Sequence, residues 1–174
     1  MRKRSKAREY ALQALYQADI RKLGARDVLL EFWNEQPAPE DIASFATLLV
    51  NGTIKHLAEI DTLIGHHADN WDMKRMAVVD RNILRLGAYE LLHVDDIPPS
   101  VSINEAIELA KRFGDSESAK FINGILDAIH KASPSSKKKA AADHRPHPAN
   151  GATEPRPESA AADDDNDDEK KEDA

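Results

Sequence analysis

The chain has 174 residues, with 24 Lys and Arg against 31 Asp and Glu, a formal net charge of −7 and no cysteine. It lacks the run of about 18 apolar residues that a membrane-spanning helix needs, and no apolar segment follows the basic N-terminus as in a secretory signal. The absence of cysteine excludes disulfides, thiolate metal sites and cysteine nucleophiles, and is typical of the reducing cytoplasm. We therefore expect a cytoplasmic protein without membrane contact.

The composition divides the chain into two parts. Residues 133–174 contain no Val, Ile, Leu, Met, Phe, Trp or Tyr. Such a segment cannot bury enough apolar surface to offset the entropy lost on folding. We predict one compact domain over residues 1–132, followed by a disordered low-complexity tail over residues 133–174 that is acidic at its end.

The first predicted helix covers residues 1–22 and carries apolar side chains on two sides. One stripe, at spacings of three and four, consists of Ala7, Tyr10, Ala11, Ala14, Leu15 and Ala18. The second stripe lies on nearly the opposite side and consists of Leu12, Tyr16 and Ile20. A helix with two apolar sides is either enclosed in a core or offers one side to a partner.

The next helices are expected over residues 27–34, 41–57, 61–68 and 77–93. The helix over 41–57 has an apolar face formed by Ile42, Phe45, Leu48 and Leu49. The segment Asn70-Trp71-Asp72 breaks the helix over 61–68, and Pro98-Pro99 stops the broadly apolar helix over 77–93.

Two more helices complete the domain. Ser102 and Glu105 form a predicted capping box, after which Glu108 and Arg112 are expected to pair and Gly114 to end the helix. The buried stripe of that helix is predicted to consist of Ile103, Ala106, Ile107, Ala110 and Phe113. Ser116 is expected to cap the last helix, which runs to Lys131 and is buried through Ile122, Ile125, Leu126 and Ile129. No segment alternates with a period of two, so the prediction is an all-α fold with about seven helices.

The sequence gives no indication of catalysis or of a cofactor. His66 and His67 are adjacent, so on a helix they point about 100° apart. His144 and His147 lie in the predicted tail, where no second shell of residues would orient them. We expect exposed or capping histidines rather than a metal site, and no phosphate loop, hydrolase or zinc-protease motif is present.

A cationic cluster opens the chain. It consists of Arg2, Lys3, Arg4, Lys6 and Arg8. Positive charge at a helix N-terminus opposes the helix dipole, so its concentration there favours binding to a phosphate backbone over a merely solvated helix start.

An aromatic residue near the C-terminal end of the domain gives a second indication. Phe121 lies at the edge of the apolar stripe of the last helix, and Lys120 precedes it. An edge aromatic beside a cation suits stacking on an unpaired base, although a Phe at such a position is by itself more often part of a core.

Four blocks of sequence together resemble the NusB family of bacterial transcription antitermination factors. They read AREYALQALY at 7–16, ILRLGAYEL at 83–91, INEAIELAKRFG at 103–114 and KFINGILD at 120–127. The resemblance implies two three-helix bundles without catalytic activity. It also implies that the protein pairs with the ribosomal protein NusE, that the pair binds the boxA element of nascent ribosomal RNA as single-stranded RNA, and that the complex joins other Nus factors on RNA polymerase.

The resemblance also assigns roles to individual residues. The RNA-binding set it implies is Arg2, Lys3, Arg4, Lys6, Arg8, Glu117, Lys120 and Phe121. Tyr16 and Asp80 match positions that face the ribosomal-protein partner. The chain departs from the family pattern at Ser5, where arginine is common, and at Glu117 and Ala119, where the family often has Asp and His.

Two other functions stay open at this point. The chain would be a helical adaptor that binds only protein, or a stand-alone RNA-targeting relative of the domain fused to ribosomal RNA cytosine methyltransferases. The stripe around Tyr16 would also suit a homodimer. For the acidic tail, solubility is a simpler role than competition with RNA for the basic N-terminus.

Overall fold

The computed structural model describes residues 2–69 and 71–133, and within these residues it is all-helical, as predicted. The α-helices are α1 (Lys3–Arg21), α2 (Ala25–Glu35), α3 (Glu40–Lys55), α4 (Leu57–His67), α5 (Val78–His93), α6 (Pro99–Phe113) and α7 (Ser118–Ala132), with a short 3-10 helix η1 (Met73–Arg75) before α5. Among the described residues, no helix is both long enough and apolar enough to cross a membrane.

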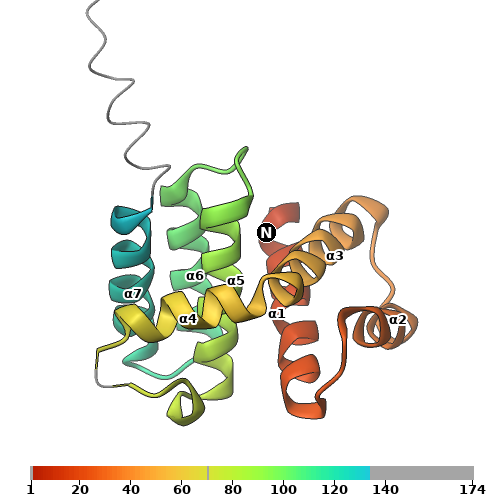
Figure 1. Cartoon of the computed structure of the whole chain (residues 1–174). Helices are drawn as coiled ribbons and strands as arrows, with labels where there is room; N and C mark the ends of the chain where they lie inside the picture. Colours follow the sequence, from red (N-terminus) through yellow and green to blue (C-terminus); the bar gives the residue numbers. More distant parts are fainter. Residues whose placement is uncertain (1, 70, 134–174) are drawn as a thin grey trace, which may run out of the picture. The chain divides into compact units, whose positions relative to one another are not determined.

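The helices pack as two three-helix bundles, which confirms the predicted architecture (Figure 1). The first bundle consists of α1, α2 and α3, and the second consists of α5, α6 and α7. The remaining helix, α4, follows α3 almost directly and packs across α5 and α7. Both α1 and α3 also contact α5, so α5 is the helix that joins the two bundles.

The central position of α5 explains its broadly apolar sequence. Ile83, Leu84 and Ala88 have no exposed surface, and they lie on more than one side of the helix. Gly87 permits the close approach of α7, because a Cβ atom at this position would lie 2.8 Å from a methyl carbon of Leu126. The junction is therefore built from small and branched apolar residues without room for added volume.

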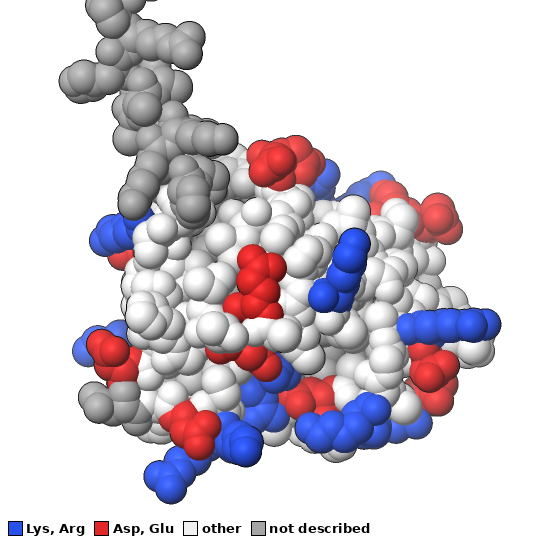
Figure 2. Space-filling view, viewed as in Figure 1, with Lys and Arg blue, Asp and Glu red and all other residues white. Residues whose placement is uncertain are grey.

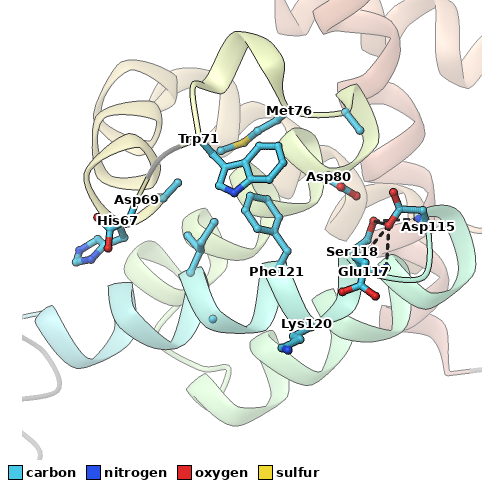
Figure 3. Close-up of a pocket in the computed structure, with 14 residues that line it drawn as sticks. His67, Asp69, Trp71, Met76, Asp80, Asp115, Glu117, Ser118, Lys120 and Phe121 are labelled. Carbon is cyan, nitrogen blue, oxygen red and sulfur yellow. Dashed lines mark hydrogen bonds between the residues drawn. The ribbon is translucent and has the colours of Figure 1, made fainter.

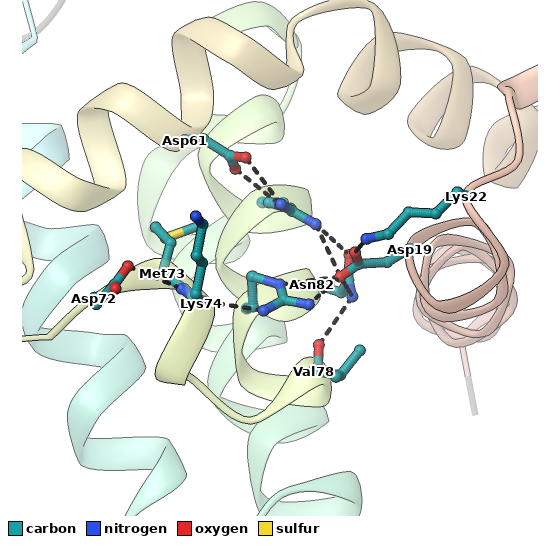
Figure 4. Close-up of polar contacts among 10 residues, drawn as sticks. Asp19, Lys22, Asp61, Asp72, Met73, Lys74, Val78 and Asn82 are labelled. Atoms are coloured by element: carbon teal, nitrogen blue, oxygen red, sulfur yellow. Dashed lines mark hydrogen bonds and ion pairs between the residues drawn. The ribbon is translucent and has the colours of Figure 1, made fainter.

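A buried ionic network also joins the bundles and was not predicted from the sequence (Figure 4). Asp19 of α1 accepts hydrogen bonds from Arg81 at 2.7 Å, from Asn82 at 3.0 Å and from Arg85 at 3.0 Å. Arg85 also holds both carboxylate oxygens of Asp61 of α4, at 2.7 and 2.8 Å. Burial by itself would raise the pKa of Asp19, but the hydrogen bonds from Arg81 and Asn82, together with the positive charges of Arg85 and Arg81, outweigh burial and lower it.

Two predicted helix starts are corrected by the structure. The helix expected over 61–68 begins at Leu57, directly after His56, which is the only residue between α3 and α4. The helix expected from Ser102 begins at Pro99. A proline in the first turn loses nothing, because the N–H groups of that turn have no partner within the helix.

The predicted capping box of Ser102 and Glu105 is therefore wrong. Both residues lie inside α6, and the Ser102 hydroxyl donates to Glu90 of α5 at 2.8 Å. Glu105 instead accepts a hydrogen bond from Ser5 of α1, also at 2.8 Å. The predicted Glu108–Arg112 pair is wrong as well, because Arg112 pairs with Glu9 of α1.

Other local predictions are corrected by neighbouring residues. Leu48 and Phe113, both expected in buried stripes, are 47% and 37% exposed. Asp115, rather than Ser116, caps α7, because its carboxylate accepts from the backbone N–H groups of Glu117 and Ser118 at 2.9 and 3.0 Å. The last helix, α7, finishes at Ala132, and the predicted domain boundary after residue 132 stays a prediction. The predicted disorder of the tail concerns residues that, after position 133, lie outside those described.

Candidate nucleic-acid interface

Most of the N-terminal cations are exposed and weakly held. Arg2 is exposed, Lys3 pairs with Asp41 while its side chain stays 76% exposed, and Arg4 lies 3.3 Å from Asp96 with 54% exposure. Pairs between exposed side chains contribute about 0–1 kcal/mol each, so a phosphate could displace the acidic partner at little cost. The first turn of α1 contains no acidic residue to neutralise these charges.

Lys6 is half-buried and more closely engaged. Its Nζ lies 3.1 Å from a carboxylate oxygen of Glu9, and it also sits over the ring of Tyr10. On the face shown in Figure 2, Lys and Arg side chains lie beside Asp and Glu rather than gathering in an area of one sign. RNA binding at these positions would therefore exchange existing ion pairs for contacts with phosphate.

Arg8, which the sequence placed among the RNA-binding residues, is an exception because its side chain is enclosed within the protein. Its side chain is 3% exposed and forms two hydrogen bonds with Glu90, at 2.9 and 2.6 Å. Glu105 approaches the same guanidinium at 3.7 Å. Arg8 therefore ties α1 to α5 and α6 within the protein, and its charge is already neutralised.

A groove of about 400 Å³ lies between α1 and α6, next to the N-terminal cations. Its lining is mixed in charge, with Arg2, Lys111 and Arg112 against Glu9, Glu105 and Glu108. Lys111 pairs with Glu108 and Arg112 pairs with Glu9, so these cations are already engaged. Sequence reasoning did not identify this groove, because it placed Arg112 in a pair with Glu108.

The larger pocket, of about 710 Å³, opens between α7 and the segment that joins α4 to α5 (Figure 3). Phe121 lines it and meets the ring of Trp71 edge to face, with centroids 5.6 Å apart. Trp71 is 55% exposed, so part of its ring faces solvent at this pocket while the rest contacts Phe121. Glu117 and Lys120 line the same pocket and are exposed. The predicted residues of α7 are thus brought together, whereas the sequence identified Trp71 only as part of a helix break.

Asp80 also lines this pocket, although it was expected to face a protein partner. It is 8% exposed, and its Oδ1 atom is buried without a hydrogen-bond partner among the described residues. Burial raises the pKa of Asp80, and the nearby charge of Asp115 raises it further, against a hydrogen bond from Ser118 that lowers it. Because so little of Asp80 reaches the surface, contact with a partner is restricted to the part that faces the pocket.

Tyr16 lies elsewhere, on the second apolar stripe of α1. Leu12 of that stripe is buried, whereas Tyr16 is 38% and Ile20 52% exposed. One end of the stripe, at Leu12, is therefore part of the core, whereas Tyr16 and Ile20 at the other end form an uncovered apolar strip, called the Tyr16 strip below. Tyr16 is not among the residues that line the pocket with Asp80, so the two predicted partner residues are not brought together there.

Three side chains capable of holding a metal lie apart from these surfaces. They are His56, Glu59 and His93, whose ligand atoms all lie within 4.8 Å of one another. Sequence spacing did not reveal them, because they come from the junction of α3 and α4 and from the end of α5.

Known proteins resemble this chain over the whole helical domain. The chain is 48% identical to the transcription antitermination protein NusB of Desulfatibacillum aliphaticivorans over 130 residues, which are 75% of this chain and 91% of that protein. The structure of T. maritima NusB matches with a TM-score of 0.71 and 40% identity, covering 78% of this chain and 96% of that one. A chain from a crystal structure of the antitermination factors NusB and NusE in complex with double-stranded RNA matches with a TM-score of 0.70 and 34% identity, covering 76% and 99%.

The family model agrees with these relatives. It is described as the NusB family and matches residues 5–131, which include all seven helices except the first residues of α1 and the last of α7. The chain belongs to the NusB family.

Proposed function

We propose that the chain is a non-catalytic transcription antitermination factor that binds boxA-type single-stranded RNA of nascent ribosomal transcripts together with the ribosomal protein NusE. In this role it works in the cytoplasm with other Nus factors on RNA polymerase. Its relatives carry the name transcription antitermination protein, and a neighbour at 34% identity was solved with NusE and RNA.

The single observation that supports RNA binding most directly is the aromatic pair at the large pocket. Trp71 offers an exposed ring, Phe121 packs against it, and Lys120 lines the same pocket. Unpaired bases stack on such rings, and a nearby cation holds the adjoining phosphate.

The N-terminal residues Arg2, Lys3, Arg4 and Lys6 form the second part of the proposed interface. The acidic partners of Lys3 and Arg4 are exposed, so phosphates can replace them, whereas Lys6 pairs with the buried carboxylate of Glu9. Arg8 is left out of the interface because it is buried against Glu90. The uncovered strip of Tyr16 and Ile20 is the proposed docking surface for NusE.

A salt titration tests the proposal. Binding of a short boxA-like RNA would be measured by fluorescence anisotropy, with and without NusE, from about 50 to 200 mM salt. Contacts with about five phosphates predict a slope near −3.5 in log K against log salt, which is a loss of about 100-fold over that range. Binding should tighten when NusE is present.

A matched pair of variants separates RNA binding from a pure adaptor. Replacing Arg2, Lys3 and Arg4 with Ala should reduce the slope by about 2. The control replaces Arg26, Lys55 and Lys131, which are also exposed, and changes the net charge equally. Equal effects of the two triple variants, or no RNA binding in any condition, would favour the adaptor, which docks protein through the Tyr16 strip alone.

A further inference from the structure

We propose that His56, Glu59 and His93 form a binding site for a divalent transition-metal ion of the zinc type. His56 is the single residue between α3 and α4, Glu59 lies in the first turn of α4, and His93 ends α5. One ligand atom from each lies within 4.8 Å of the others. This site is separate from the proposed RNA interface, and it does not depend on that proposal.

The imidazole of His56 is oriented as a metal ligand. Its Nδ1 lies 2.9 Å from the carbonyl oxygen of Gly52, to which it donates a hydrogen bond. That bond assigns the proton to Nδ1 and leaves the lone pair of Nε2 free. Metal-binding histidines almost always donate their other ring N–H in this way, which sets the tautomer and the direction of the ring.

His93 presents its Nε2 to the same point. This atom lies 3.5 Å from a carboxylate oxygen of Glu59, and the side chain of His93 is 27% exposed. The rings of His56 and His93 are stacked with centroids 4.0 Å apart and an interplanar angle of 28°. Two imidazole rings and a carboxylate therefore lie together from three segments of the chain, and one of the stacked rings has to turn for both nitrogens to reach the same ion.

The rings are held in place by Tyr89, one turn before His93 on α5. The Tyr89 ring lies 5.5 Å from that of His93 and 5.8 Å from that of His56. Tyr89 fits there because residue 52 is glycine, since a Cβ atom would come within 1.9 Å of its ring. The two histidines are thus held side by side by packing before any ion binds.

The chemistry of the three ligands suits zinc. Tetrahedral Zn²⁺ with bonds of about 2.0–2.2 Å places its ligand atoms about 3.3 Å apart, so ligand atoms that lie up to 4.8 Å apart have to approach one another by up to about 1.5 Å. Glu59 supplies this freedom because its side chain is 53% exposed. Two nitrogens and one oxygen leave a fourth position for water, and the same set would bind Co²⁺ in the same geometry.

Co²⁺ provides a direct test, because tetrahedral coordination gives an intense visible absorption band that octahedral hydrated Co²⁺ lacks. Full-length protein without an affinity tag would be titrated with CoCl₂, and Zn²⁺ would then be added to displace it. The expected result is a tetrahedral spectrum at one ion per chain. His56→Gln, Glu59→Gln and His93→Gln should each weaken binding at least tenfold.

Two control variants use four of the five other histidines of the chain. His66→Gln/His67→Gln and His144→Gln/His147→Gln should keep the affinity of the unchanged protein. Circular dichroism establishes that each variant is folded, and Glu59→Gln serves as the safest of the three because Glu59 is at the surface. Shifts of the imidazole proton resonances on adding Zn²⁺ should be confined to His56 and His93.

Several outcomes would overturn the proposal. Octahedral spectra, unchanged binding in Glu59→Gln and His93→Gln, or loss of binding in either control variant would each show that the cluster is not a metal site. In that case the contact between His93 and Glu59 is an ordinary surface ion pair beside stacked rings.

Discussion

Replacement of Arg8 distinguishes a structural role from an RNA-binding role, because the sequence favoured the latter. The Arg8 and Glu90 side chains are each 3% exposed and are joined by two hydrogen bonds. Removing one partner of such a pair leaves a buried charge without compensation, which costs about 3–5 kcal/mol. For a helical domain of about 130 residues, Arg8→Ala should lower the Tm by roughly 10–18 °C.

The assay is urea unfolding followed by circular dichroism, on Arg8→Met, Glu90→Leu and the double variant. The double variant removes both charges, so it should be more stable than the sum of the single changes predicts by at least about 1 kcal/mol. A parallel series at Arg4 and Asp96, an exposed pair, should show a coupling below about 1 kcal/mol.

The refuting result is specific. If Arg8→Ala unfolds within about 1 kcal/mol of the unchanged protein, the pair is not a buried structural contact. If Arg8→Met remains folded yet loses one phosphate from the salt slope of RNA binding, Arg8 reaches RNA after all. Either outcome would favour the interpretation that Arg8 belongs to the RNA-binding cluster at the N-terminus.

Three more predictions concern the pocket and the ionic network. Phe121→Ala should weaken RNA binding in the anisotropy assay by about 1–3 kcal/mol, which is about 5- to 150-fold. Phe121→Trp should keep most of the affinity, because it retains an aromatic ring. Equal losses of affinity in the two variants would contradict base stacking. The pKa of Asp80 is raised in the folded protein, so its favourable contribution to the free energy of unfolding is complete below the ordinary Asp pKa and is lost as the pH rises through the folded value. In urea melts at neutral pH, Asp80→Asn should therefore be more stable than the unchanged protein. In acid this gain in stability should disappear. The pKa of Asp19 is lowered, so its contribution to the free energy of unfolding is complete above the ordinary Asp pKa and is lost as the pH falls through the folded value. At pH 7, Asp19→Asn should therefore lower the free energy of unfolding by at least about 2 kcal/mol. A loss of stability that did not shrink in acid would argue against the ionic network.

Helical periodicity determined most of the fold before any tertiary contact was considered. The stripe of Ile122, Ile125, Leu126 and Ile129 is buried as predicted, because side chains three and four apart share one face of any α-helix. The cationic start and the edge position of Phe121 were also visible in the sequence, since both depend on order along the chain. The four family blocks added the expected two bundles.

What depended on neighbours in space was decided only by the tertiary structure. Ser102 and Glu105 fit a capping box by spacing, but residues of α5 and α1 lie close enough to bind them instead. Arg8 looked like one more exposed cation until Glu90, distant in sequence, was found opposite it. Local pattern reports which side of a helix is apolar, whereas the partner of a polar side chain depends on which helix packs there. The same limit explains why the Trp71–Phe121 pair and the cluster of His56, Glu59 and His93 became visible only when separate helices were brought together.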